Sequence, residues 1–319
     1  MRDWQSFACS SGSRECLLSV IVPVYNYHDR VAACLESVVT QLTSQCELIV
    51  VDDGSTDNTQ SVIKDFVVAE NVAAGYVLQN NQGPGAARNR GIALSCGRWI
   101  MPLDADDTLL PEALASILAV LKKSDSIDLL VGGHVVLSES GSSVTRLPGP
   151  ISDNPKRRVL SYLLCHGISI LHGATVFARE LLERCPYPEH IRQSEDVAIF
   201  AYALSCPRVV LLDIPLVIIN KHPDSLRHDV RLALDGGQCV ADQVFRYLPP
   251  EYERYRSRFE AQRALSAFRG FYRAQCVQEA DFFFRKAVSL SWRQALRWSY
   301  LSKWIRMRLR LLLMGKRTD

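Results

Sequence analysis

The sequence has no apolar run long enough to span a membrane. A spanning helix needs roughly 18 uninterrupted apolar residues, and the best stretch, Val209 to Ile219, is broken by Asp213 and Pro215. The residues before Leu17 also lack the apolar segment of a secretory signal peptide. We therefore expect a chain that stays in the cytoplasm, where it is made.

Cysteine spacing that would mark a zinc site is also missing. The ten cysteines form no C-x-x-C pair and no histidine-interleaved pattern, so we expect reduced, mostly buried thiols. A G-x-G-x-x-G motif directly after the first strand and the Gly-Lys-Ser/Thr ending of a P-loop are absent too, which excludes two common phosphate-binding loops. At 48% hydrophobic and 22% charged residues, the composition excludes intrinsic disorder.

Charge is divided unevenly along the 319 residues. Residues 1–250 hold 21 Lys and Arg against 28 Asp and Glu, whereas residues 251–319 hold 16 against 6. The formal net charge of +3 therefore combines an acidic part with a basic end. Because the larger part is acidic and carries no nucleic-acid-binding motif, we expect no nucleic-acid partner.

From Leu17 onward, short β-branched runs alternate with segments of helical period, which predicts an α/β fold built from βα units. The predicted strands are 18–24, 47–51, 75–78, 99–103, 129–136, 174–178 and 209–219. The predicted helices are 30–41, 59–70, 86–95, 111–123 and 194–204, with a hairpin or loop over 138–155 and helical character from 251 onward.

Polar side chains follow three of the predicted strands. The first strand ends in residues 23–26 (Pro-Val-Tyr-Asn), the second in residues 52–57 (Asp-Asp-Gly-Ser-Thr-Asp), and the fourth in residues 104–107 (Asp-Ala-Asp-Asp). Residues 80–91 form a further polar, glycine-containing segment before the fourth strand. Because open α/β sheets bind ligands at the carboxyl ends of their strands, we expect these segments to form one binding rim.

Asp104 and Asp106 stand two positions apart just beyond a buried strand, so alternation places both carboxylates on one side. Mg²⁺ or Mn²⁺ takes one or two such carboxylates and completes its shell with water and substrate phosphate. The pair predicts a divalent cation on a nucleotide diphosphate, and a helix-capping Asp cluster before Pro111 is the alternative. An EF-hand is excluded, because Leu109 and Ala115 stand where its loop needs Gly and Glu.

Two other segments suit a nucleotide. Asp52 and Asp53 can accept hydrogen bonds from a base or from ribose hydroxyls, and Gly54 allows close backbone approach; a turn before a helix N-cap is the alternative. The segment from Gly83 to Gly91 offers backbone amides, Arg88 and a helix N-terminus, which suit phosphate.

Together, these motifs resemble those of the family 2 glycosyltransferases with the GT-A fold. The resemblance covers residues 17–225 and rests on segments 19–26, 51–57, 81–91 and 103–107, in the family's order. It implies a Rossmann-like, mostly parallel central sheet flanked by helices. It also implies transfer of a sugar from a nucleotide-diphosphate donor, with inversion at the anomeric carbon and Mg²⁺ or Mn²⁺ on the diphosphate.

The resemblance further implies a set of site residues. The base that accepts the proton of the acceptor hydroxyl would be Asp196, with Glu195 orienting the acceptor or tuning its neighbour; an acidic helix N-terminus is the alternative, and both can hold. The cation would be held by Asp106, Asp104 and His228. The donor would contact Pro23, Tyr25, Asn26, Asp52, Asp53, Gly83, Arg88, Asp104, Ala105 and Arg227, the last in a basic loop for which a solvated turn is the alternative.

The expected acceptor is a glycan or a lipid-linked glycan of bacterial surface polysaccharide assembly. The Gln-x-x-Arg-Trp signature of the family's processive members is absent, which favours transfer of a single sugar. A sugar-1-phosphate nucleotidyltransferase and a non-catalytic nucleotide-sugar-binding protein are the alternatives. We expect an N-terminal extension over 1–16, a donor-binding half over 17–137, an acceptor and base half over 138–228, and a basic helical appendage over 229–319.

The segment Trp292 to Leu313 predicts an amphipathic helix. Its apolar stripe is flanked by Arg and Lys, which suits an anionic membrane surface, here the inner face of the cytoplasmic membrane. The alternative is a helix packed on the catalytic domain or on a second copy of the chain. The stripe residues are Trp298, Leu301, Ile305, Leu309 and Leu312.

Overall fold

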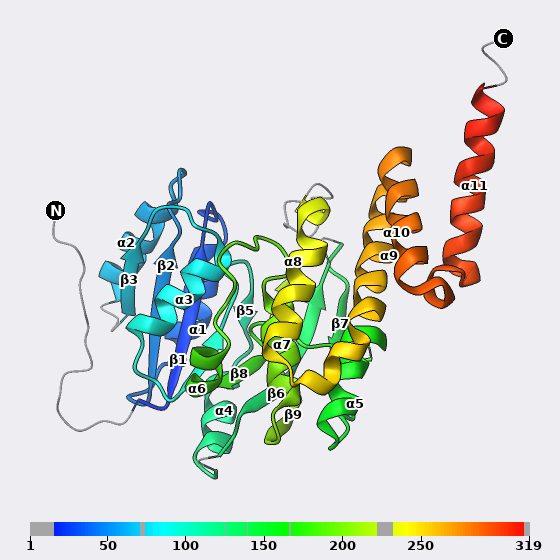
Figure 1. The fold of residues 1–319 in the computed structure, drawn as a ribbon. Helices are drawn as coiled ribbons and strands as arrows, with labels where there is room; N and C mark the ends of the chain where they lie inside the picture. The colour runs from blue at the N-terminus through cyan, green and yellow to red at the C-terminus, as the bar shows by residue number, and fades with distance from the viewer. Residues whose placement is uncertain are drawn as a thin grey trace.

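The computed structural model describes residues 16–70, 74–124, 126–138, 140–165, 167–221 and 232–315. A single mixed sheet with helices on both faces forms the body, and the last helices project from one end of it (Figure 1). The strands are β1 (Leu18–Val24), β2 (Cys46–Asp52), β3 (Ala74–Leu78), β4 (Trp99–Pro102), β5 (Thr108–Leu109), β6 (Leu129–Leu137), β7 (Ser143–Arg146), β8 (Thr175–Ala178) and β9 (Val209–Asn220).

The strand order is β3-β2-β1-β4-β8-β6-β9-β5, with β7 paired to β6 outside this path. The four strands from β3 to β4 are mutually parallel. Beyond them, β8 runs antiparallel to both β4 and β6, and β5 runs antiparallel to β9. The expected α/β sheet flanked by helices is confirmed, whereas its antiparallel strands were not indicated by the sequence pattern.

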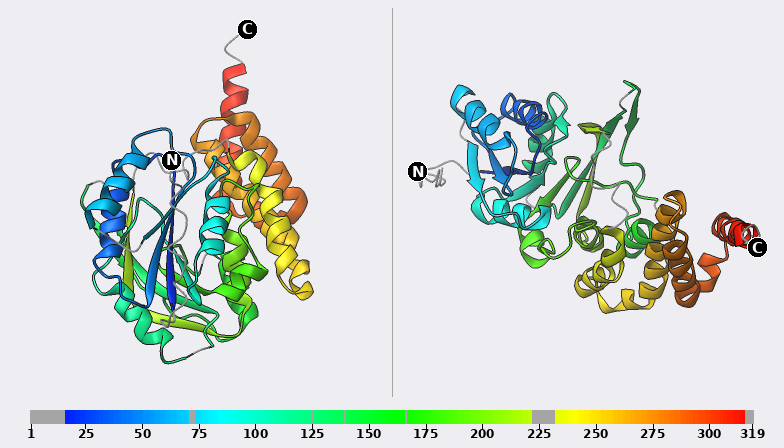
Figure 2. Two further views of the ribbon diagram at one scale, coloured as in Figure 1. Left: turned by 90° about the vertical axis from the view of Figure 1, so that its left-hand side faces the viewer. Right: turned by 90° about the horizontal axis from the view of Figure 1, so that it is seen from above.

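Alternation along the strands sends side chains to two separate cores. Val20 and Val22 of β1 pack with α1, α2 and α4 on one face, whereas Ile21 packs toward α3, α7 and α8 on the other, and Figure 2 shows the two helical layers on opposite sides of the sheet. The helices are α1 (Val31–Val39), α2 (Thr59–Glu70), α3 (Pro84–Leu94), α4 (Ala113–Leu121), α5 (Pro155–Leu160), α6 (Arg179–Arg184), α7 (Asp196–Ser205) and α8 (Leu232–Tyr247).

Helix α3 lies directly against β1 because residue 91 is a glycine. A Cβ atom at Gly91 would come within 2.4 Å of the Ile21 Cγ2 atom, far inside van der Waals contact. Pro84 stands in the first turn of the helix, where its missing N–H leaves no bond unmade. This close packing holds the middle of α3, with the buried Arg88, near the end of β4.

The C-terminal helices begin inside the main body and then leave it. Helix α8, the 3₁₀ helix Pro250–Tyr255 and Phe259 of α9 (Arg256–Arg273) share a buried cluster with α7. From Ala264 onward, α9 forms a separate core with α10 (Val277–Ala295) and α11 (Trp298–Gly315). Helix α8 and the first part of α9 thus share a core with the sheet, whereas the rest of α9 packs with α10 and α11. Among the described residues, no helix has the length and apolar character that crossing a bilayer requires.

Candidate active site

The loops that follow β1 and β2 are tied to each other through Asn26. Its Oδ1 accepts a hydrogen bond from the Thr56 backbone N–H at 2.8 Å, and its own N–H donates to the Ser55 Oγ at 3.0 Å. Asn26 adopts a left-handed conformation with φ of 57°, which asparagine tolerates better than most residues. Tyr25 beside it is exposed, so the rim presents an aromatic face to solvent.

Asp53 is buried at the end of β2 and fixes the segment that leads into α3. Its carboxylate accepts hydrogen bonds from the Gln82 N–H at 2.8 Å, the Gly83 N–H at 2.7 Å and the Gln79 Nε2 at 2.8 Å. Asp52 is fully buried and accepts from the Ser55 N–H at 2.8 Å. The two carboxylates therefore shape the rim, and their predicted contacts with the donor remain predictions.

Gly54 and Gly83 both have positive φ, 77° and 99°, in the region that only glycine enters freely. A Cβ at Gly54 would lie 2.9 Å from the Asn81 backbone nitrogen. The segment 79–83 therefore packs on residue 54 without a side chain between them.

The aspartates after β4 occupy a turn that β9 supports. Asn220, the last residue of β9, donates from its Nδ2 to the Asp106 carbonyl at 2.7 Å and from its backbone to Asp107 at 3.2 Å. Asp107 is buried, whereas the Asp104 and Asp106 side chains are partly exposed at the rim. Burial raises the pKa of the Tyr27 hydroxyl, and the negative charges of Asp106 and Asp104 raise it further.

Arg88 joins two parts of the site that lie far apart in sequence. Its Nη2 donates to Asp104 Oδ1 and its Nη1 to Glu195 Oε1, both at 2.7 Å. Burial disfavours the charged guanidinium, but the two carboxylates outweigh burial and raise the pKa of Arg88 above its ordinary value. Burial likewise acts against an ionised Asp104, yet Arg88 and His172 hold the pKa of that carboxyl well below its usual range.

Sequence reasoning missed His172 and Tyr187. His172 is buried with its Nδ1 3.7 Å from Asp104 Oδ1, and the Tyr187 hydroxyl lies 3.0 Å from its Nε2. Tyr187 also lies under the Arg88 guanidinium, 5.3 Å from ring centroid to Cζ. His172 precedes β8, and because β8 is antiparallel to β4, its start meets the end of β4. Knowledge of that strand direction would have pointed to His172.

The Glu195–Asp196 pair opens α7 after a strained turn. Ser194 has φ of 67°, a conformation that L-residues seldom adopt outside functional or tightly held turns. Burial raises the pKa of Glu195, Arg88 opposes that change, and the neighbouring Asp196 adds to it. Burial and the charge of Asp196 both raise the pKa of Tyr162, which lies on the π-helical turn Ser161–Cys165.

Arg263 of α9 reaches this turn from the C-terminal region and donates to the Ser194 Oγ at 3.0 Å. Hydrogen bonds from charged groups contribute about 1.5–3 kcal/mol. We expect R263M to lower the free energy of unfolding by about that amount in guanidinium titrations. R258M, at an exposed position of the same helix, should change it by no more than about 0.5 kcal/mol. Equal stability of the two variants would show that α9 does not support the Ser194 turn.

Two predicted site residues, Arg227 and His228, lie outside the described residues. Within the part of the chain that is described, no group of three or more His, Cys, Asp or Glu side chains is arranged to hold a metal ion. Of the three residues predicted to hold the cation, the structure therefore describes only Asp104 and Asp106.

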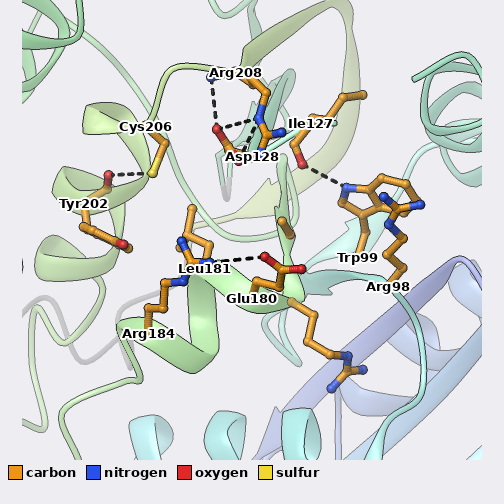
Figure 3. Close-up of a pocket in the computed structure, with 12 residues that line it drawn as sticks. Arg98, Trp99, Ile127, Asp128, Glu180, Leu181, Arg184, Tyr202, Cys206 and Arg208 are labelled. Carbon is orange, nitrogen blue, oxygen red and sulfur yellow. Dashed lines mark hydrogen bonds and ion pairs between the residues drawn. The ribbon is translucent and has the colours of Figure 1, made fainter. Parts of the chain in front are cut away.

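A pocket of about 340 Å³ lies at the opposite end of the strands from the rim, near the start of β4 and the end of β8 (Figure 3). Its arginines are held by the fold: Arg208 contacts Asp128 at 2.5 Å, and Arg179 donates to the Gly97 and Ile92 carbonyls at 2.8 and 2.9 Å. Because the pocket lies at the start of β4 and the rim follows the end of that strand, the pocket is separate from the predicted site residues.

The structure has a GT-A fold. It combines a parallel half-sheet with a polar rim at the strand ends, and Arg88 links that rim to the helix of Glu195 and Asp196. The model of the glycosyl transferase family 2 matches residues 19–184, and the chain belongs to this family. The family predicted from the sequence is confirmed.

Curated relatives agree with this assignment. An uncharacterized glycosyltransferase of Escherichia coli, YibD, is 38% identical over 109 residues, which covers 34% of this chain but only 31% of that protein. The succinoglycan biosynthesis protein ExoO of Rhizobium meliloti is 28% identical over 72% of this chain and 67% of that protein.

Two solved structures share the fold. S. aureus TarS in complex with UDP-GlcNAc has a TM-score of 0.58 and 20% identity, covering 85% of this chain and 81% of that one. The mannosyltransferase PcManGT of Pyrobaculum calidifontis, in complex with GDP-Man and Mn²⁺, has a TM-score of 0.54 and 19% identity, covering 94% and 88%.

Proposed function

We propose that this protein is an inverting glycosyltransferase that moves one sugar from a nucleoside-diphosphate donor to a glycan or lipid-linked acceptor in bacterial polysaccharide assembly. The observation that carries the proposal is the Arg88 bridge, because one guanidinium holds both Asp104 of the donor rim and Glu195 beside the predicted base. The buried Arg88 guanidinium therefore links the predicted donor side of the site to the predicted acceptor side.

The donor would lie along the rim formed by the loops after β1, β2 and β4. Asn26 and Asp53 fix the shape of these loops, Tyr25 offers an exposed ring for a base, and the amides of the segment from Gly83 lead into the N-terminus of α3, which favours phosphate. Pro23, Asp52 and Ala105 would contact the donor along the same rim, and Arg227 would add a positive charge beside the diphosphate. The fold neighbours TarS and PcManGT hold UDP-GlcNAc and GDP-Man, which supports a donor of this chemical class.

The residues at the end of β4 fit a divalent cation. Asp104 is kept ionised by Arg88 and His172, its side chain is 33% exposed, and Asp106 stands partly exposed two residues on. Carboxylate oxygens are the ligands that Mg²⁺ and Mn²⁺ prefer. Asp104 and Asp106, with His228, would hold the ion, and a bound ion would supply positive charge against the charge that develops on the leaving diphosphate.

Asp196 would accept the proton of the acceptor hydroxyl as that oxygen attacks the anomeric carbon. Attack from the side opposite the leaving diphosphate inverts the configuration. Glu195 is bound to Arg88 and would therefore orient its neighbour and the acceptor, whereas no ion pair holds Asp196 within the described part of the chain. The relative ExoO is a succinoglycan biosynthesis protein, which supports a glycan acceptor.

Release of nucleoside diphosphate from UDP- and GDP-sugars, with and without EDTA, tests this function. We expect release to fall by about a hundredfold or more in EDTA and to return with Mn²⁺, because the ion contributes several kcal/mol of charge stabilisation. Release of nucleoside triphosphate only when pyrophosphate is added would indicate a nucleotidyltransferase. Donor binding with no release under any condition, including a panel of glycan acceptors, would indicate a non-catalytic protein.

A further inference from the structure

Helix α11 divides its apolar residues between two faces. One face packs on the neighbouring helices: the Trp304 ring stacks on Phe284 with centroids 5.0 Å apart, its Nε1 donates to Asp281 at 2.7 Å, and Met307 is buried. The packed face anchors α11 to α9 and α10, so the helix is held as part of the fold.

The other face is apolar and exposed. Trp298, Ile305 and Leu309 are 74%, 36% and 52% exposed. At 3.6 residues per turn, the three side chains fall within an arc of about 40°, so they form one stripe along the helix. The last turns of α10 add Trp292 and the residue after this helix adds Leu296, which are 59% and 45% exposed. We call these five residues the α11 stripe.

Cations flank the stripe on both sides. By the same helical geometry, Arg306 and Lys303 lie on one side of the stripe and Arg308 lies on the other. No Asp or Glu occurs from residue 282 to residue 318, whereas ten Lys and Arg do. Figure 1 shows that α11 projects away from the sheet, so the body of the protein leaves this face accessible.

We propose that the α11 stripe docks on an anionic lipid surface, with α11 lying in the plane of the interface. The exposed tryptophans and leucines would enter the boundary between headgroups and acyl chains, and the flanking cations would contact anionic headgroups. A second copy of this surface is a poor occupant: Asp281 pairs with Arg308 at 3.8 Å, but cations still outnumber acids around the stripe, so two such faces repel each other. The positive charge around the stripe thus favours docking on an anionic lipid surface over association of two copies of the chain.

Vesicle co-sedimentation of the full chain tests the proposal. We expect binding to phosphatidylcholine vesicles that contain roughly 30% phosphatidylglycerol, little binding to pure phosphatidylcholine, and release at high salt, since each cation near the surface contributes measurably. W298Q/L309Q should weaken binding by about tenfold or more. The control V144Q/L147Q removes two apolar side chains of similar exposure, 55% and 47%, outside the C-terminal helices and should bind like the wild type.

Four results would overturn the proposal. The first is no binding to the anionic vesicles, and the second is equal binding to neutral vesicles. The third is equal weakening of binding by both double variants. The fourth is a concentration-dependent dimer, seen by analytical ultracentrifugation, that W298Q/L309Q abolishes, because the stripe would then belong to a self-association interface. Because the side chains changed are exposed, equal melting temperatures of wild type and variants are expected.

Discussion

D196N should bind the donor like the wild type and lose transfer. The substitution keeps the size of the side chain but removes the group that accepts the acceptor's proton, and general base catalysis contributes about 10²–10⁴-fold in rate. We therefore expect kcat to fall by about that factor while the donor Kd stays unchanged. Steady-state transfer assays and donor titrations on the same preparation measure both quantities.

The control for D196N is E180Q. Glu180 is an exposed carboxylate in the first turn of α6. Its substitution therefore tests the effect of removing an acid from a helix N-terminus, where such a side chain contributes about 0.3–1 kcal/mol of stability. E180Q should transfer sugar at the wild-type rate. If D196N also transferred at that rate, Asp196 would be only an acidic residue at a helix N-terminus.

R88M should destabilise the protein and abolish transfer together. It leaves Asp104 and Glu195 without the cation that bridges them, and removing one partner of a buried ion pair costs about 3–5 kcal/mol. Guanidinium titration should show a loss of this size, and kcat should fall below detection because the donor rim and the base helix are no longer held together. R88K keeps the charge but not the forked geometry, so it should recover part of the stability and little of the activity.

R90M is the matched control for R88M, because Arg90 is exposed on the same helix. Its unfolding free energy should change by no more than about 0.5 kcal/mol. If R88M were as stable as R90M, the Arg88 bridge would not be the link between the two halves of the site.

The parallel half of the sheet and its polar rim could be predicted because their signals are local. Strands such as 18–24 are short β-branched runs, and the carboxylates that follow them stand at the strand ends in the sequence itself. The four mutually parallel strands β1 to β4 confirm that prediction. The predicted helix from residue 111 begins instead at Ala113, because Glu112 before it adopts a left-handed conformation with φ of 63°.

The other half of the site depends on long-range geometry. His172 reaches Asp104 only because β8 is antiparallel to β4, and Arg263 reaches Ser194 only because α9 folds back on the sheet domain. Neither position has a local pattern that marks it. Likewise, helical periodicity could place Trp298, Ile305 and Leu309 on one stripe but could not show that Trp304 would anchor the opposite face.

Titration calorimetry of UDP and GDP with Mn²⁺ tests the central claim most directly, because it needs no acceptor. The wild type should bind at least one of the two nucleotides more tightly with Mn²⁺ than without. D106N should lose the metal-dependent part of the affinity, and D196N should keep it, since Asp196 acts on the acceptor side. Failure of the wild type to bind either nucleotide, or an equal loss in D106N and D196N, would contradict a donor site at Asp104 and Asp106 that is separate from the base.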